Sequence, residues 1–246
     1  MNVDEHLEPL GNGISVIVSA KNHFSTDTVL LADFAAPKKY ENVVEFGAGC
    51  GAISLIWCRN QPPKSIVAVE IQKSASNMML RSVELNNLQD KISVLNADLR
   101  YLKNIITAGS VDMVAMNPPY KIGGGGVVND SLEKRIARHE INCTIDDITR
   151  SAAEILRFGG RFCLCQRPER LADVFLSMRN AGIEPKKFRL VQQRKDKPPK
   201  LFLVEGRRGG NPGGLVTLPT LFIEDENGNF SPEMIDIYGD YKEGYI

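Results

Sequence analysis

The stretch Asn42-Val43-Val44-Glu45-Phe46-Gly47-Ala48-Gly49-Cys50-Gly51 decides the fold, together with the apolar segment that begins at Ala52. A short apolar run ends in three alternating glycines, and a second apolar run follows them. This order predicts a buried strand over Asn42–Phe46, a tight turn, and a helix over Ala52–Asn60. Glycines at such a turn let the backbone bend sharply and approach a ligand at the carboxyl end of the strand, where open α/β sheets bind nucleotides.

The same rhythm continues along the chain and predicts an α/β fold. Short apolar runs alternate with longer amphipathic segments, which is typical of a mostly parallel sheet with helices on both faces. The last two runs are joined by a connection too short for a parallel crossover, so we expect one antiparallel strand to end the sheet. The seven predicted strands are Asn42–Phe46, Ser65–Ile71, Lys91–Leu95, Val111–Met116, Gly160–Gln166, Lys187–Gln193 and Leu201–Glu205, and further helices are expected at Gln72–Asn87, Ile145–Phe158 and Glu169–Ala181.

Segments of different character flank this pattern. Alternating residues around the turn Gly11-Asn12-Gly13 predict a short N-terminal hairpin. A helix is expected over Thr26–Phe34, with Ser25 or Thr26 as its cap. After Gly206 the glycine-rich sequence indicates a turn-rich connection to a short tail strand. The predicted division is therefore a hairpin and covering helix over residues 1–40, a catalytic domain over 41–208, and a C-terminal extension over 209–246.

Composition indicates an ordinary globular protein. Of the 246 residues, 43% are hydrophobic and 24% are charged. No uninterrupted apolar run is long enough for a membrane span, and the N-terminus has no basic flank before an apolar run, so we expect a cytoplasmic protein without membrane contact. The five scattered cysteines include no CxxC pair, which favours reduced thiols and no metal site. The composition leaves the oligomeric state open.

The glycine loop alone admits more than one interpretation. Such turns often serve only to pack a helix against a strand. Glu70 ends the second predicted strand, where a carboxylate can accept hydrogen bonds from ribose hydroxyls, and this position also fits NAD. The G-x-G-x-G spacing, however, lacks the third glycine position of the dinucleotide pattern. Glu45 places a carboxylate just before the glycine loop, and a negative charge there suits an ammonium or sulfonium group better than a pyrophosphate. The combination favours S-adenosylmethionine.

The third strand ends in Asn96-Ala97-Asp98-Leu99. Asp98 there could contact the amino group of an adenine, or it could cap the next turn. The glycine loop and Glu70, at the ends of the two preceding strands, favour the contact with adenine.

The fourth strand delivers Asn117-Pro118-Pro119-Tyr120 at its carboxyl end. In an arbitrary protein this motif is simply a rigid turn. Beside a cofactor loop it suits methylation of an amide or exocyclic amine, because such a nitrogen is a poor nucleophile and must be held in line with the methyl group. The Asn117 side-chain oxygen and the Pro118 carbonyl can accept its N–H bonds, while Tyr120 offers a stacking face. No strong base is required, and His139 is interpreted as a substrate-loop or structural residue.

These motifs resemble the bacterial tRNA1(Val) adenine-N6 methyltransferases, within the wider class of Asn-Pro-Pro-Tyr amino-methyltransferases. The resemblance runs from Leu7 to about Phe230 and includes the segment Phe24–Ala32 and the downstream Ala137-Arg138-His139-Glu140. It implies a Rossmann-like class I methyltransferase fold, a segment around Phe24, Thr26 and Asp27 that closes over the cofactor, and an adenine beside the anticodon as acceptor. The glycine-rich stretch Lys121–Asn129 departs from the family, whose members vary at this place. The remaining candidate cofactor residues are Glu45, Phe46, Gly47, Ala48, Gly49, Gly51, Glu70, Ile71, Asp98, Leu99 and Asn117.

Charge distribution is compatible with RNA as the partner, although the net charge is zero. Residues 186–208 hold nine Lys or Arg against two acids, whereas residues 224–246 hold seven acids against one Lys. A phosphate-contacting rim is expected from Lys134, Arg135, Arg138, Arg194, Lys195, Lys197 and Lys200, which could equally be ordinary solvated surface.

Two alternative functions remain. Glutamine-N5 methyltransferases of release factors use the same tetrapeptide, but they usually carry a larger N-terminal domain. A non-catalytic RNA-binding module is the other alternative.

Overall fold

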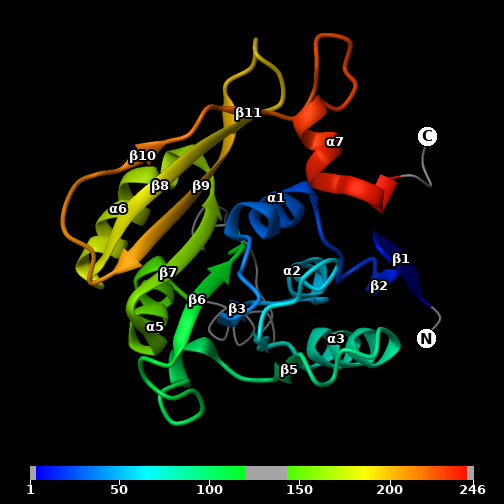
Figure 1. Cartoon of the computed structure of the whole chain (residues 1–246), viewed down its shortest axis with the longest axis horizontal. Coiled ribbons are helices and arrows are strands. Elements are labelled where there is room, and N and C mark those ends of the chain that lie inside the picture. Colours follow the sequence, from blue (N-terminus) through cyan, green and yellow to red (C-terminus); the bar gives the residue numbers. More distant parts are fainter. Residues whose placement is uncertain (1–3, 120–142, 243–246) are drawn as a thin grey trace, which may run out of the picture.

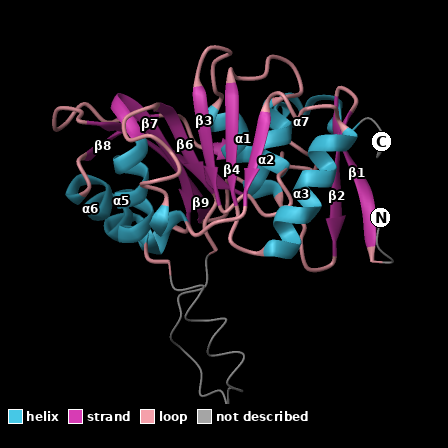
Figure 2. Cartoon of the chain, turned by 90° about the horizontal axis from the view of Figure 1, so that it is seen from below, coloured by secondary structure: helices cyan, strands magenta, loops and turns pink. Residues whose placement is uncertain are grey.

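A computed structural model describes residues 4–119 and 143–242. A central sheet carries helices on both faces, and a separate hairpin lies at one side (Figures 1 and 2). The hairpin consists of β1 (Glu5–Gly11) and β2 (Ile14–Ser19). The sheet strands are β3 (Asn42–Phe46), β4 (Ser65–Val69), β5 (Ile92–Leu95), β6 (Val111–Met116), β7 (Leu156–Gln166), β8 (Ile183–Gln192), β9 (Pro199–Arg208), β10 (Val216–Thr217) and β11 (Leu221–Phe222).

The helices connect these strands in the expected alternation. They are α1 (Thr26–Ala35), α2 (Ala52–Trp57), α3 (Lys73–Leu85), α5 (Ile145–Ile155), α6 (Leu171–Asn180) and α7 (Pro232–Tyr238), with short 3₁₀ turns η1 (Leu99–Tyr101), η2 (Pro168–Arg170) and η3 (Gly239–Lys242). One hydrophobic cluster joins α1, α2, α3 and α7 to one face of the sheet, and a second joins α5 and α6 to the other. The prediction of an α/β fold with helices on both faces is confirmed.

The sheet order is β10-β8-β9-β7-β6-β3-β4-β5, and β11 also pairs with β8. Strand β9 runs antiparallel to both β7 and β8, while the other pairs are parallel. The expected seven long strands and the single antiparallel strand are present. Two details were wrong: the antiparallel strand lies inside the sheet rather than at its end, and the two-residue strands β10 and β11 extend the sheet beyond β8.

One predicted helix is too long. The apolar spacing of residues 145–158 predicts a helix through Phe158, but α5 ends at Ile155 and β7 begins at Leu156. Leu156 is buried and pairs with Val111 of β6, so parallel strand pairing overrides the local helical pattern. Phe158, which the pattern assigned to the helix, is exposed instead. The helix predicted at residues 52–60 also ends early, at Trp57.

The terminal segments belong to the same core as the sheet. Strand β2 contacts α3, where the Ile17 amide donates to Ser82 Oγ (3.0 Å). Helix α7 lies beside α1 (Figure 1), and its buried side chains join the first hydrophobic cluster. Arg59 connects both ends of the chain, because its Nη1 donates to the carbonyls of Leu10 (3.0 Å) and Tyr238 (2.9 Å).

Candidate functional site

The carboxyl ends of five strands meet at one edge of the sheet. Strand register aligns Leu95, Val69, Phe46, Met116 and Leu164 across β5, β4, β3, β6 and β7. The residues that follow these five therefore form one row along the edge, with neighbouring strands about 4.8 Å apart. That row contains Asn96, Glu70, Gly47, Asn117 and Cys165. The cofactor and acceptor motifs, far apart in sequence, thus lie on adjacent strands.

The glycine loop adopts the backbone that its sequence predicts. Gly47, Gly49 and Gly51 have φ values of +63°, +56° and +88°, a region that side chains other than glycine rarely adopt. A Cβ at Gly51 would lie 2.6 Å from Met79 Cγ, so this glycine permits close packing of α2 on α3. A Cβ at Gly49 would meet no atom within 4 Å. The interpretation as a packing turn therefore accounts for Gly51 but leaves the open side of the loop at Gly49 unexplained.

Glu70 organises this loop from the neighbouring strand. Its buried carboxylate accepts the Gly49 amide (2.8 Å) and the Gln72 amide (2.7 Å). A carboxylate oxygen can accept a further hydrogen bond, so these contacts orient Glu70 without preventing a role toward ribose hydroxyls. The next residue, Ile71, is exposed, and Phe46 and Ala48 are buried beside the loop.

Glu45 faces the interior rather than the open side of the loop. Its carboxylate is 2% exposed and accepts hydrogen bonds from the Ser54 amide (3.0 Å) and the Ser54 hydroxyl. Burial raises the pKa of Glu45 to about 8 against the opposing effect of these hydrogen bonds. Glu45 thereby connects β3 to α2, and its contact with a cationic cofactor group stays a prediction.

Asp98 adopts the capping arrangement that the sequence also allowed. Its carboxylate accepts the Arg100 amide (2.9 Å) at the start of η1 and pairs with Arg100 Nη2 (2.5 Å). Partial burial opposes ionisation, but the hydrogen bonds and charge of Arg100 outweigh it and lower the pKa of Asp98. Leu99 beside it is buried. The predicted contact of Asp98 with an adenine is not tested by these contacts.

Asn117 connects three elements at the acceptor end of the row. Its Nδ2 donates to Thr28 Oγ1 on α1 (3.2 Å), and its Oδ1 accepts from Cys165 Sγ on β7 (3.0 Å). Pro118 is buried, whereas Pro119 is exposed. Thr28 and Cys165 were not predicted as site residues. Cys165 could be predicted from the strand register, which aligns it with Asn117, but this register is known only once the strands are paired.

Several predicted residues lie outside the described part of the chain. These are Tyr120, the stretch Lys121–Asn129, and Lys134, Arg135, Arg138 and His139 with the surrounding Ala137–Glu140.

The N-terminal segment reaches the same site through α1. Thr26 Oγ1 accepts a hydrogen bond from the Tyr238 hydroxyl (3.2 Å), and the Phe24 ring lies 6.1 Å from the Tyr241 ring. Asp27 is half-buried in the first turn of α1. Because Thr28 contacts Asn117, the segment that contains Phe24, Thr26 and Asp27 lies next to the acceptor motif.

The basic block of residues 186–208 divides into two parts. Lys187 and Arg207 both pair with Glu205, and Arg189 pairs with Glu233, so these cations have acidic partners within the protein. The segment from Arg194 to Lys200 also contains ion pairs, between Asp196 and both Arg194 and Lys197. It follows β8, which runs parallel to β7, and therefore lies at the same edge as Asn117. Lys195, between β8 and β9, and Lys200, at the start of β9, are exposed.

All five cysteines are free thiols. Among residues 4–119 and 143–242, no cluster of His, Cys, Asp and Glu suits a metal ion. Across those same residues, every helix is too short or too polar to cross a membrane.

Comparisons with known proteins agree with this architecture. The chain is 27% identical over 145 residues to a tRNA1(Val) (adenine(37)-N6)-methyltransferase of Bacteroides thetaiotaomicron, a match that covers 56% of this chain and 57% of that relative. It is 25% identical over 219 residues to the protein of the same name from Porphyromonas gingivalis, covering 85% of this chain and 84% of that one. The first of these matches thus spans little more than half of the relative's length.

Solved structures share the fold at lower identity. A predicted O-methyltransferase of Agrobacterium tumefaciens superposes with a TM-score of 0.69 at 21% identity, over 88% of this chain and 97% of that chain. M. jannaschii TYW2 in complex with AdoMet superposes with a TM-score of 0.58 at 16% identity, over 85% of this chain and 88% of that chain. The predicted methyltransferase fold is confirmed.

The family match decides the class of protein. The family model described as methyltransferase small domain matches residues 16–179, which include the glycine loop, Glu70, Asp98 and Asn117. This match confirms the predicted class of enzyme and, with it, S-adenosylmethionine as the cofactor. The chain belongs to the methyltransferase small domain family.

Proposed function

We propose that this protein transfers the methyl group of S-adenosylmethionine to N6 of an adenine in tRNA, near the anticodon. The observation that carries the proposal is the register of β3 and β6: Phe46 pairs with Met116, so Gly47 and Asn117 emerge side by side. A Cβ at Gly47 would lie 3.3 Å from Met116 Cε, so the Met116 side chain packs against this glycine. The curated relatives carry the same activity in their names.

The residues present fit the cofactor. Gly49 presents backbone toward open space, and the Glu70 carboxylate lies on the adjacent strand, where it can accept hydroxyl donors. Gly47, Gly49 and Glu70 would hold S-adenosylmethionine, and Asp98 lies at the end of the next strand. When bound, S-adenosylmethionine supplies an electrophilic methyl group.

The acceptor nitrogen is oriented by hydrogen-bond acceptors. Asn117 Oδ1 and the Pro118 carbonyl accept the two N–H bonds of an exocyclic amine, which directs the nitrogen lone pair toward the methyl group. The two prolines stiffen the loop and remove competing backbone donors. Transfer makes the nitrogen acidic, so the proton leaves to water afterwards and no strong base is needed.

The segment from Arg194 to Lys200, with the exposed Lys195 and Lys200, supports a polyanionic substrate. It lies at the carboxyl edge of the sheet, where its cations can contact phosphates without reading the sequence. An unpaired loop suits the reaction because the adenine must leave its stack, which costs least in a single-stranded region. With tRNA as the substrate, we also propose a cytoplasmic location.

Transfer of labelled methyl from S-adenosylmethionine tests the function. Unmodified tRNA and a peptide release factor are offered in parallel, and the labelled product is hydrolysed to nucleosides or amino acids. Label in N6-methyladenosine is expected. Label in N5-methylglutamine, or in neither product, would overturn the assignment in favour of a protein substrate or a non-catalytic module.

Asn117→Ala tests the assigned site. We expect turnover to fall below detection while cofactor affinity, measured by calorimetry, changes less than about twofold. Asn42→Ala is the matched control, because Asn42 lies at the opposite end of the adjacent strand β3, and it should retain activity. An active Asn117→Ala variant would refute the role of this residue.

A further inference from the structure

Two buried side chains from distant parts of the sequence hold the Asn117 carboxamide. Cys165 Sγ donates to its oxygen (3.0 Å), and its nitrogen donates to Thr28 Oγ1 (3.2 Å). Cys165 is fully buried and Thr28 is 8% exposed. We propose that Thr28 and Cys165 are positioning residues that fix the orientation of the Asn117 carboxamide for the methyl acceptor. This inference rests on the role of Asn117 proposed above.

The chemistry of a carboxamide explains the need for such residues. Rotation of an Asn side chain by 180° exchanges an acceptor oxygen for a donor NH₂ at almost the same position. An amine acceptor requires the oxygen to face it. A thiol is a donor toward that oxygen, and the Thr28 hydroxyl oxygen accepts from the amide nitrogen, so the observed contacts favour one of the two orientations. An orientation established before the substrate binds costs no reorganisation during the reaction.

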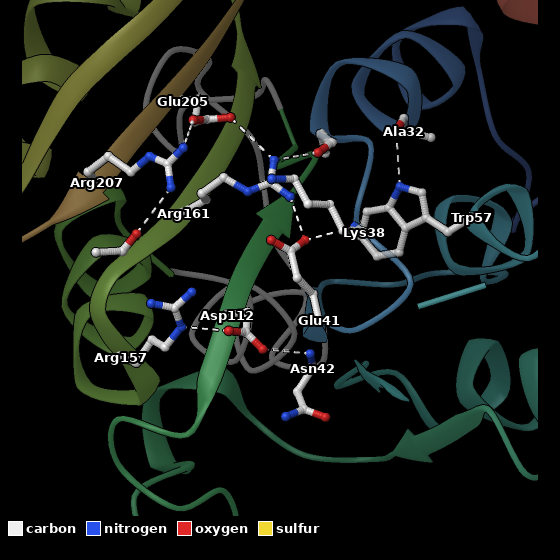
Figure 3. Close-up of polar contacts among 12 residues, drawn as sticks. Ala32, Lys38, Glu41, Asn42, Trp57, Asp112, Arg157, Arg161, Glu205 and Arg207 are labelled. Carbon is white, nitrogen blue, oxygen red and sulfur yellow. Dashed lines mark hydrogen bonds and ion pairs between the residues drawn. The ribbon is translucent and has the colours of Figure 1, made fainter. Parts of the chain in front are cut away.

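Thr28 lies on a helix whose far end is anchored. Trp57 Nε1 donates to the Ala32 carbonyl (3.0 Å), and Arg161 Nη1 donates to the Ala35 carbonyl (2.7 Å) (Figure 3). Both bonds fix carbonyls in the last turns of α1 to α2 and β7. Because α1 is a continuous, rigid helix, these anchors at its C-terminal end also hold Thr28 in its first turn against Asn117.

Cys165 is held just as firmly by the sheet. It lies on β7, which pairs with β6 on one side and β9 on the other. Leu164 pairs with Met116, so the following residues, Cys165 and Asn117, are neighbours across the two strands. The polar contact to Asn117 is therefore a consequence of strand register.

Cys163 provides a matched control for Cys165. It lies two residues earlier on the same strand, so the two side chains point to the same face, and both are fully buried in the same hydrophobic cluster. Replacement of either cysteine by Ala removes one buried sulfur atom from this hydrophobic cluster. Cys163 is aligned with Ala115 of β6, which has no polar side chain.

Steady-state kinetics of the full-length variants test the inference. For Cys165→Ala we expect kcat to fall about threefold to tenfold, the effect of one hydrogen bond, with KM and cofactor affinity nearly unchanged. Thr28→Val should behave alike. Cys165→Ser, which replaces the thiol donor with a hydroxyl donor, and Thr28→Ser, which retains the hydroxyl, should recover most of the loss. Cys163→Ala should retain the kcat of the parent protein. Equal losses in Cys163→Ala and Cys165→Ala would show a packing effect and overturn the proposal.

A spectroscopic readout separates this inference from the proposed reaction. The side-chain NH₂ signals of Asn117, assigned by their loss in Asn117→Asp, should shift in Cys165→Ala and Thr28→Val and stay in place in Cys163→Ala. An unchanged signal in Cys165→Ala would refute the positioning role even if the enzyme is active. If the parent protein does not methylate tRNA, the proposed function is refuted. The NMR signals would still show whether Cys165 and Thr28 contact the Asn117 carboxamide.

Discussion

Glu45 shows how burial changes the role that a residue's position suggests. As a carboxylate before a glycine loop, it was expected to face a cationic group. In the structure its side chain is buried against Ser54, and desolvation raises its pKa to about 8. Burial therefore favours the neutral form of Glu45, whose hydrogen bonds to Ser54 fix α2 to β3.

This shift predicts a pH-dependent stability. The folded-state pKa of about 8 lies above the ordinary value of 4.5, so between these values the folded protein binds more protons than the unfolded chain. Stability from Glu45 is complete below pH 4.5 and is lost as the pH rises toward 8. We expect the melting temperature of the cofactor-free protein, relative to that of Glu45→Gln, to fall by roughly 3 °C or more across this range. Glu84→Gln, the same change at an exposed site, is the control, and parallel curves for Glu45→Gln and the parent protein would contradict the prediction.

At the scale of elements, a buried ionic cluster fixes α1 to the sheet. Arg161 on β7 pairs with Glu41 (2.7 Å) and with Glu205 on β9 (3.3 Å), and it also donates to the last turn of α1 (Figure 3). The three charged side chains are each less than 10% exposed. Such a cluster is poor evidence for net stability, but the loss of one member leaves the opposite charge buried.

Arg161→Met is therefore expected to lower the free energy of unfolding by about 3–5 kcal/mol, because Glu41 loses its cationic partner. The double variant Arg161→Met with Glu41→Gln should recover part of that loss. Arg157→Met is the control, since the Arg157–Asp112 pair is half exposed on the Arg side and should contribute less than about 1 kcal/mol. Equal losses in the two single variants, measured by urea denaturation, would argue against a buried cluster as the anchor of α1.

The segment from Arg194 to Lys200, which joins β8 to β9 and includes the start of β9, gives a second prediction at this scale. Lys195→Glu with Lys200→Glu should raise KM for tRNA about tenfold or more and make it less sensitive to salt, because phosphate contacts release counterions. Lys38→Glu with Lys39→Glu makes the same charge change at the opposite edge of the sheet, before β3. If both double variants bind tRNA equally poorly, net charge rather than this segment governs binding.

At the scale of the whole molecule, the C-terminal segment contributes to the hydrophobic core. Met234 and Ile237 of α7 are buried in the cluster that contains α1 and α2, and Tyr238 contacts Thr26 at the site. The C-terminal segment thus contacts the N-terminal hairpin, through Tyr241 and Glu8, and the segment beside the acceptor motif, through Tyr238 and Thr26.

Met234→Ala should consequently destabilise the entire protein. A fully buried Met replaced by Ala costs about 2–5 kcal/mol, and we expect the single main unfolding transition to shift. Ile235→Ala, one residue further on the exposed side of the same helix, should change little. A main transition that stays in place with Met234→Ala, in calorimetry, would show that residues 209–246 fold separately.

The sequence by itself determined the alternation of strands and helices, the glycine loop and the Asn117 motif, because hydrophobic periodicity and the backbone freedom of glycine are local properties. Strands Asn42–Phe46 and Val111–Met116 were predicted to the residue for this reason. Only the tertiary structure decided the end of α5, the interior place of β9, and the inward orientation of Glu45. Thr28 and Cys165 belong to the second group as well. Their contact with Asn117 depends on strand register and on how α1 packs on the sheet, and both are set by pairing between residues far apart in the chain.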